Sequence, residues 1–355
     1  QHSSLLLSKI KNCRLHCIFS PEHGFNLNLK AGEFVPHSVH AKTNIPIYSL
    51  YGKTRKPTAR ILKNIDTIIF DIQGLATRTY TYLSTLQLVM SSAAQYNKKI
   101  IVADRPVPLP AVSDGPILIR SHKSFVGMAK VPMAYGMTYG ETALWFKKNI
   151  PIKIDLKIGK MTGYHRENKP RVGWPEWIPP SPQIRNWESA CCYPATVFCE
   201  AMPSLDNGRN TARAFQVVGA PWIKASAFAR KMRNMRLPGI NFKPIKYKSM
   251  FGPYNGQTLN GLLLSVTDPA SFRPILTAVS IISVLQELHG YKRVWQSYKT
   301  RTDFFDKLFG TDKIRKSLML GEPPRTIAIR WRKDLSDFRL TRKSCMIYHS
   351  RKRGS

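Results

Sequence analysis

Apolar runs alternate with segments of helical spacing over the first 105 residues. Residues 66–72 and 99–104 (DTIIFDI and KIIVAD) are β-branched runs of the kind found in fully buried strands. A shorter apolar run, residues 14–19, ends at Ser-Pro, and residues 80–96 carry apolar side chains at helical spacing. Buried strands separated by helices predict an α/β fold with a parallel sheet and right-handed crossovers.

Prolines interrupt this alternation between residues 105 and 135. We expect no regular element there, because the stretch contains Pro106, Pro108, Pro110 and Pro116. Helical spacing returns at residues 138–148 and at residues 268–290, where a Pro lies near the start and a Gly at the end. A second structural part begins near Phe215, and two domains fit a length of 355 residues.

The composition adds a strong positive charge to this picture. Hydrophobic residues make up 43% of the chain, which excludes a disordered protein, and no apolar run approaches the roughly 18 residues of a membrane span. Lys and Arg number 55 against 21 Asp and Glu, a net charge of +34. Such an excess predicts anionic surroundings: nucleic acid, a phosphate-rich polymer, an anionic membrane surface or an acidic glycan.

One stretch concentrates this excess. Between Asp206 and Asp268 there are ten basic residues and no acidic residue. A solvated face of mixed charge does not account for it, because the compensating acids are missing. The stretch therefore predicts an anionic ligand or polymer, although no nucleic-acid motif accompanies it.

Neither the cysteines nor the N-terminal residues indicate the cellular compartment of the protein. Six cysteines lack the paired CxxC spacing of a zinc site, so they leave the redox compartment open. Leu5–Leu7 is too short for the apolar region of a signal peptide, so an export signal was removed or lies outside this sequence.

Acidic and basic side chains follow all three predicted strands of the first 105 residues. Parallel sheets bind ligands at the carboxyl ends of their strands, so these side chains are expected at one edge. A helix cap or a structural salt bridge is an equally good reading of each acid. The residues at these strand ends are Glu22, His23, Asp71, Gln73, Arg78, Tyr80, Tyr82, Asp104 and Arg105.

Paired carboxylates suit glycoside hydrolysis, in which one acid protonates the leaving oxygen and the other activates water or attacks the sugar. Their separation, and with it retention or inversion, stays open. The segment GWPEWIPP adds Trp174 and Trp177, whose rings could stack on sugars or pack the loop. His23, His37 and His40 have a mixed spacing that favours solvated histidines over a metal site. Without a P-loop, GxGxxG or GxSxG motif, we expect neither a cofactor nor a serine nucleophile.

Taken together, these residues resemble the exo-β-N-acetylmuramidases of the NamZ type, which are bacterial peptidoglycan-recycling glycosidases. The likeness runs through nearly the whole chain in the order of the family. The segments that carry it include FSPEHGF (19–25), IPIYSLYG (45–52), IDTIIFDIQ (65–73), RTYTYLST (78–85), DRPVP (104–108), YGMTYGE (135–141), YPATVFCE (193–200) and GAPW (219–222).

The resemblance implies a Rossmann-like N-terminal domain, residues 1–212, and a smaller C-terminal α/β domain, residues 213–355, with a cleft between them. It also implies an opening segment with the family's first strand, which this sequence does not contain. The implied reaction releases terminal N-acetylmuramic acid from the non-reducing end of a glycan, without a metal or cofactor. The implied location is periplasmic or secreted, with the cytoplasm as the alternative.

The resemblance makes Glu22, in the PEHG motif, the catalytic glutamate. Asp71 is the expected second carboxylate, with Glu200 as an alternative. Muramic acid carries a lactyl carboxylate, which arginines can pair with bidentately. The expected substrate-binding residues are His23, Gln73, Arg78, Tyr80, Tyr82, Arg105, Glu141, Trp177, Glu200 and Arg209.

Several motif positions depart from the family. Acidic, amide, imidazole or glycine positions have become Gly74, Ala76, Val107, Tyr135, Ala201–Pro203 and Asn210. These changes indicate that the chain keeps the fold of the family more closely than it keeps the residues of the active site. The alternative hypothesis is therefore a non-catalytic relative that binds an anionic wall polymer or nucleic acid. The oligomeric state stays open.

Overall fold

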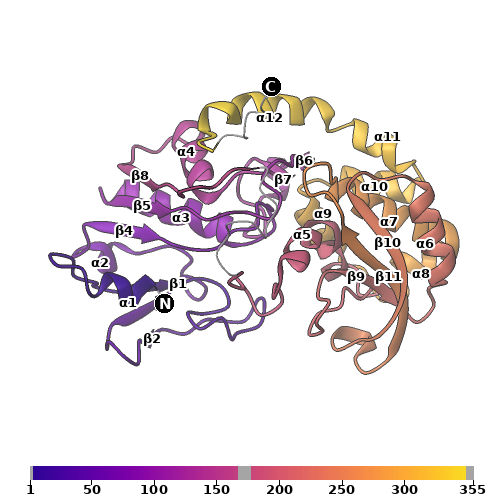
Figure 1. Ribbon diagram of the computed structural model, residues 1–355, viewed down its shortest axis with the longest axis horizontal. Helices are drawn as coiled ribbons and strands as arrows, with labels where there is room; N and C mark the ends of the chain where they lie inside the picture. Colours follow the sequence, from indigo (N-terminus) through magenta and orange to yellow (C-terminus); the bar gives the residue numbers. More distant parts are fainter. Residues whose placement is uncertain (1–2, 167–176, 349–355) are drawn as a thin grey trace.

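The computed structural model describes residues 3–166 and 177–348, which form two α/β halves placed side by side (Figure 1). The predicted parallel sheet is confirmed in the N-terminal half. Its strand order is β4-β5-β8, with every neighbour parallel, and Ile68 and Ile100 in register. The strands are β4 (Thr67–Phe70), β5 (Lys99–Ala103) and β8 (Leu156–Gly159).

Two predicted helices pack beside this sheet. The segment of helical spacing at residues 80–96 forms α3 (Tyr82–Gln95), and the segment at 138–148 forms α4 (Tyr139–Asn149). Thr138 begins α4 with a capping box, in which its hydroxyl accepts from the Glu141 N–H and the Glu141 carboxylate accepts from the Thr138 N–H. Shorter helices before them are α1 (Ser3–Leu7) and α2 (Ala59–Leu62).

The first predicted strand belongs to a different sheet, which corrects the expectation of three strands at one edge. β1 (Ile18–Ser20) pairs in parallel with β3 (Pro46–Ser49), and β2 (Ser38–Val39) pairs antiparallel with β3. Residues that follow β1 therefore need not lie beside those that follow β4 and β5.

The proline-rich stretch also differs from its prediction. It forms a two-stranded antiparallel sheet from β6 (Asp114–Ile117) and β7 (Pro132–Ala134), together with the 3-10 turn η1 (Arg120–His122). The pairing of β6 and β7 shifts register between Asp114 and Ile117, and Pro132 is the first residue of its strand. Both positions tolerate a residue without an N–H, so proline and a short ladder coexist.

The C-terminal half contains an antiparallel sheet in the order β10-β11-β9. The long helix predicted at 268–290 is α7 (Pro274–His289), most of which is buried, and it packs against α5 and α6. The elements of this half are α5 (Trp187–Thr196), η2 (Val197–Glu200), β9 (Val217–Ala220), α6 (Ala225–Asn234), β10 (Ile240–Lys248), η3 (Gly252–Tyr254), β11 (Thr258–Val266), α8 (Tyr291–Trp295), α9 (Thr302–Phe309), α10 (Lys313–Met319) and α11 (Pro324–Ile329).

The last described helix returns to the N-terminal half (Figure 1). α12 (Arg332–Arg342) packs against β6, and the turn η4 (Lys343–Cys345) packs against α4. The buried Asp114 carboxylate in β6 accepts from the Ile275 and Leu276 N–H groups at the start of α7, at 2.7 and 3.2 Å. The two halves are thus joined by contacts distant in sequence, and the boundary at residue 212 stays a prediction.

None of the described helices combines the length and the apolar character that crossing a bilayer requires.

Candidate active site

Glu22 lies in the turn after β1, with its carboxylate pointing into the protein. It is 7% exposed. Its Oε1 accepts from the Gly32 N–H at 2.7 Å and its Oε2 from the Thr81 hydroxyl at 2.5 Å, just before α3. Tyr51 also hydrogen-bonds Glu22, and burial followed by the Glu22 charge raises the pKa of Tyr51 to about 12. Donors from three separate segments therefore fix the orientation of the carboxylate.

His23 adopts a left-handed backbone with φ 73°, which the next residue, Gly24, continues at φ 78°. Its Nδ1 lies 3.0 Å from the Leu29 carbonyl oxygen, which can only accept. Burial lowers the pKa of His23, Glu22 opposes this, and Arg209 adds to it. The imidazole is therefore neutral near pH 7, with its proton on Nδ1, and it lies within electrostatic reach of Arg209.

Glu200 and Arg209 form an ion pair near this turn. Arg209 Nη1 lies 3.4 Å from Glu200 Oε1, and the guanidinium stacks on the Phe251 ring at 4.4 Å. The Arg209 Nε is buried and has no hydrogen-bond partner among the described residues. The Arg301 guanidinium donates to the Glu200 carbonyl oxygen. The pair thus retains donor capacity that the described protein does not use.

The pKa of Glu200 depends in part on the negative charge of Glu22. Burial raises the pKa of Glu200 most, Arg209 and Arg301 lower it, and the negative charge of Glu22 raises it. Burial likewise dominates the raised pKa of Tyr193, to which Glu200 and Glu22 both contribute. The charge of Glu22, in the N-terminal half, therefore helps to raise the pKa of Glu200 in the C-terminal half.

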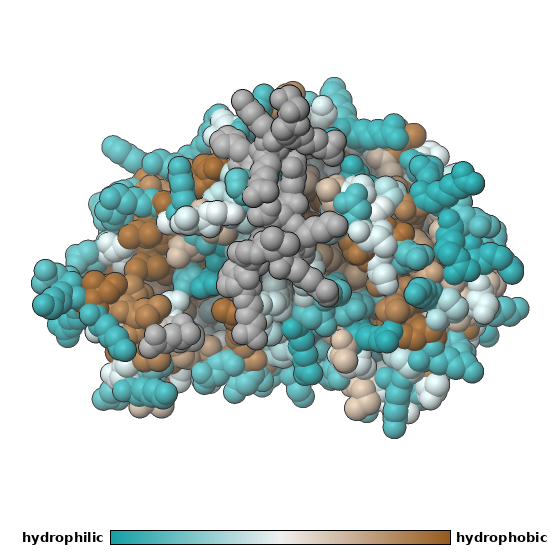
Figure 2. All heavy atoms as spheres, in the orientation of Figure 1, coloured by the Kyte–Doolittle hydropathy of each residue, from teal (hydrophilic) through white to brown (hydrophobic). Residues whose placement is uncertain are grey.

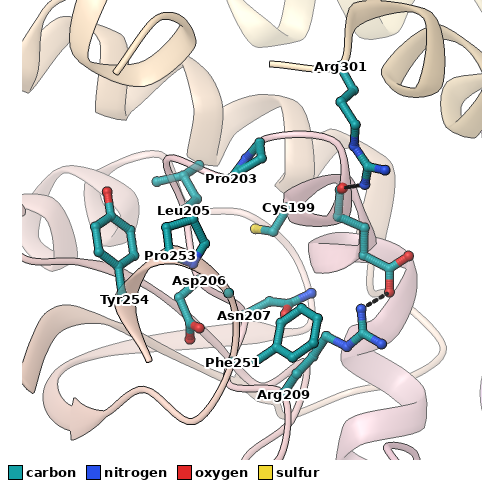
Figure 3. Close-up of a pocket in the computed structure, with 12 residues that line it drawn as sticks. Cys199, Pro203, Leu205, Asp206, Asn207, Arg209, Phe251, Pro253, Tyr254 and Arg301 are labelled. Carbon is teal, nitrogen blue, oxygen red and sulfur yellow. Dashed lines mark hydrogen bonds and ion pairs between the residues drawn. The ribbon is translucent and has the colours of Figure 1, made fainter. Parts of the chain in front are cut away.

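A pocket of about 210 Å³ lies beside Glu200 (Figure 3). Arg209 and Arg301 approach Glu200 from opposite sides. Its wall combines two carboxyl groups, Glu200 and Asp206, with two guanidiniums and aromatic surface, and the guanidiniums suit an anionic sugar. The residues that line it, all from the C-terminal half, are Cys199, Glu200, Pro203, Leu205, Asp206, Asn207, Arg209, Phe251, Gly252, Pro253, Tyr254 and Arg301.

A larger hollow of about 970 Å³ lies at the amino ends of β4 and β5, away from these groups. Both Lys and Asp side chains line it, including Lys98, Lys99, Asp66 and Asp155. Ligands of parallel sheets bind at the opposite, carboxyl ends of the strands, so this hollow is the weaker candidate.

The structure contradicts the expected substrate contact of Arg78. The side chain has no exposed surface, and burial lowers its pKa. Nη1 donates to the Pro116 and Val131 carbonyls at 2.9 and 2.8 Å, and Nη2 to the Phe309 carbonyl at 2.6 Å. Main-chain oxygens from both halves occupy its two Nη atoms, and the side chain is fully buried, so it cannot pair with a ligand.

The expected substrate contact of Glu141 is also wrong, because its carboxylate is buried and already has partners within the protein. Besides capping α4, its fully buried carboxylate pairs with Arg166 and accepts from the Ile347 N–H at 3.0 Å. It anchors the end of the chain to α4.

Tyr80 and Tyr82 are also buried and pack behind Glu22 instead of facing an opening. Their rings meet edge to face at 5.0 Å, and the Tyr82 hydroxyl lies 3.1 Å from the Glu22 carbonyl and 2.8 Å from the Pro180 carbonyl. They support the turn, and their expected contact with a sugar stays a prediction.

Asp71 and Arg105 do meet at the carboxyl ends of β4 and β5, where they pair with each other. Arg105 Nε lies 2.5 Å from Asp71 Oδ1, and the Ser3 hydroxyl donates to Oδ2. Gln73 donates to the Pro106 and Gly74 carbonyls at 2.6 and 2.9 Å. The structure thus gives these three side chains partners within the protein, and their roles toward substrate stay predictions.

Trp177 donates from Nε1 to the Ile184 carbonyl at 3.2 Å and packs edge to face on Trp187 at 5.5 Å. This favours the loop-packing interpretation. Trp174 lies outside the described residues.

Most departures from the family motifs lie in the core. A Cβ at Gly74 would come 2.8 Å from the Tyr139 ring, so an acid does not fit there. Val107 and Tyr135 are fully buried. Ala76 and Asn210 keep left-handed φ values of 52° and 64° where the family has glycine. The changes at Gly74, Val107 and Tyr135 therefore repack the interior, whereas Pro203 lines the pocket and Asn210 is exposed.

The sequence did not point to Arg301, Phe251, Tyr51 or Thr81. Tyr51 and Thr81 lie in the segments IPIYSLYG and RTYTYLST, whose likeness to the family did not single them out. Phe251 and Arg301 come from segments without a motif, and Arg301 is 101 residues from Glu200. Within the described ranges, no three His, Cys, Asp or Glu side chains are grouped to hold a metal ion.

Comparison with known proteins gives a consistent result. A family model described as exo-beta-N-acetylmuramidase NamZ, N-terminal, matches residues 1–188, and the corresponding C-terminal model matches residues 191–348. The peptidoglycan beta-N-acetylmuramidase NamZ of Bacillus subtilis (strain 168) is 35% identical over 344 residues, which cover 97% of this chain and 82% of that protein.

Two crystal structures of DUF1343 family proteins from Bacteroides fragilis NCTC 9343 are also similar. One has a TM-score of 0.89 at 30% identity and covers 98% of this chain and 90% of its own. The other has a TM-score of 0.75 at 29% identity and covers 98% and 89%.

Proposed function

This chain belongs to the exo-beta-N-acetylmuramidase NamZ family, and we propose that it releases terminal N-acetylmuramic acid from the non-reducing end of peptidoglycan fragments. Family membership makes it a peptidoglycan glycosidase. The pocket at Glu200 supports the narrower proposal, because Arg209 and Arg301 supply positive charge beside a carboxyl group. Muramic acid carries a lactyl carboxylate that these arginines can pair with, whereas N-acetylglucosamine has no such group.

We assign the two catalytic carboxyl groups to Glu22 and Glu200. The donors from Gly32 and Thr81 suit an ionised Glu22, which acts as base or nucleophile at the anomeric centre. The raised pKa of Glu200 keeps its proton available for the leaving oxygen. Asp71 is less suited to the second role, because Arg105 and Ser3 already occupy its carboxylate.

Arg209 has the geometry of a group that recognises the lactyl carboxylate. Phe251 holds the guanidinium plane, and the buried Nε is a donor without a partner among the described residues. A protonated Glu200 leaves the Arg209 charge uncompensated, so an arriving carboxylate restores the balance.

Chromogenic glycosides of N-acetylmuramic acid and N-acetylglucosamine test the proposal directly. We expect turnover of the muramic acid glycoside alone, and a loss of about 100-fold to 10,000-fold in kcat for Glu22→Gln. The far-ultraviolet circular dichroism of the variant should match that of the wild type. Equal turnover of the two sugars, or full activity of Glu22→Gln, would contradict it.

A further inference from the structure

Several basic side chains come together at one end of the C-terminal sheet. Lys246 in β10 is the cross-strand partner of Asn260, whose side chain donates to the Pro221 carbonyl at 3.4 Å. Three residues after Pro221, the Lys224 N–H lies 3.4 Å from His289 Nε2. We define the basic face as Lys224, Lys246, Lys248, His289 and Arg293.

The positive charge of the basic face lacks compensation. Lys224, Lys246, Lys248 and Arg293 are exposed, and within the described ranges none lies within 4.0 Å of a carboxylate oxygen. Burial lowers the pKa of His289, and the charges of Lys224 and Arg293 lower it further. The neighbouring Lys231, by contrast, pairs with Glu287.

Hydrophilic residues also gather at the end of the molecule that carries α6 and α8 (Figure 2). β10 is the edge strand of its sheet, and lysines on edge strands discourage pairing between molecules. That role could account for Lys246 and Lys248. It does not account for Lys224 and Arg293, which lie outside the strand.

An aromatic cluster connects the basic face to the pocket. Trp222 packs edge to face on His289 at 5.2 Å, and its Nε1 donates to the Tyr254 hydroxyl at 3.3 Å. Tyr254 lines the pocket and packs on the half-exposed Tyr298 at 5.3 Å. A polymer bound on the basic face would therefore lie next to the proposed site of cleavage.

We propose that the basic face binds an anionic wall polymer with repeating phosphodiester groups and so holds the protein beside its glycan. The proposal rests on the proposed function, because only a wall glycosidase outside the cytoplasm meets such a polymer. Lysine ammonium groups pair with phosphate as point charges, and a regular row of phosphates engages several at once.

Sedimentation of the full chain with purified cell walls tests this, before and after chemical removal of the phosphodiester polymer. We expect binding to intact walls that falls between 50 and 200 mM salt, and little binding to stripped walls. K224Q/K246Q/K248Q should reduce the slope of log K against log salt by about two to three.

The matched control is K153Q/K157Q/K160Q, which removes equal charge from exposed positions on and beside the edge strand β8. It should bind walls like the wild type. Equal binding to stripped walls, equal weakening by both triple variants, or preferential binding of duplex DNA through the basic face would each overturn the proposal. Turnover of the chromogenic muramic acid glycoside should survive K224Q/K246Q/K248Q. If the wild type shows no turnover, the glycosidase proposal is refuted, but the wall-binding measurement can still be interpreted, because it does not depend on turnover.

Discussion

Acids lie beside arginines in two regions of this protein, at the strand ends of the N-terminal half and in the pocket of the C-terminal half. Asp71 and Arg105 are 2.5 Å apart, and Arg78 is surrounded by carbonyl oxygens. Glu200 and Arg209 are 3.4 Å apart, and both line the pocket. Charged groups whose partners belong to the fold hold the structure together, whereas a pair that lines a pocket lies within reach of a ligand.

The largest expected difference between the regions is in stability. Arg78→Met leaves several buried carbonyls without donors and should lower the free energy of unfolding by about 3 kcal/mol or more. Arg209→Met should lower it by less, about 1–2 kcal/mol, because it removes one long ion pair and the stacking on Phe251. Urea denaturation measures the free energy of unfolding of both variants. Equal losses would contradict the view that Arg78 stabilises the fold more than Arg209 does.

The same two regions should differ in substrate affinity. Arg209→Gln removes the proposed charged partner of the lactyl carboxylate and should raise KM for the muramic acid glycoside about tenfold to a hundredfold. Arg105→Gln is the control and should leave KM nearly unchanged, because Arg105 pairs with Asp71 and is not among the described residues that line the pocket. Steady-state kinetics with the chromogenic muramic acid glycoside measures KM for both variants. A larger increase in KM for Arg105→Gln than for Arg209→Gln would contradict the assignment of Arg209 to substrate binding.

Packing at Gly74 gives a smaller effect. Gly74→Ala places a methyl group against the Tyr139 ring and should lower stability by about 1–3 kcal/mol. Gly127→Ala is the matched control, since its Cβ would meet nothing closer than 3.5 Å. The difference in thermal midpoint tests whether this departure from the family is a core substitution; equal midpoints would show that it is not.

The mildest change concerns pH. Arg301 lowers the pKa of Glu200, so Arg301→Gln should raise it. A general acid loses activity as pH rises through its pKa, so the alkaline limb of the kcat profile should move to higher pH. A limb that moves to lower pH, or stays in place, would argue against Glu200 as the acid.

Sequence reasoning succeeded where local pattern determines structure. The β-branched runs of β4 and β5 and the long periodic segments of α3 and α7 follow from their own residues. Arg78 could not be interpreted in this way, because its carbonyl partners at Pro116, Val131 and Phe309 are brought together only by folding. The short pairing of β6 and β7 was missed because a register shift and an edge position accommodate proline.

The most direct test of the Glu22–Glu200 assignment is how the activity of Glu200→Gln depends on the leaving group. A nitrophenolate leaves without a proton, whereas the sugar of a natural muramyl disaccharide requires one. We predict that Glu200→Gln lowers kcat about 100-fold or more on the disaccharide and less than about tenfold on the nitrophenyl glycoside, while Asp71→Asn shows no such difference. Equal losses on both substrates, or the leaving-group dependence appearing in Asp71→Asn instead, would contradict the assignment.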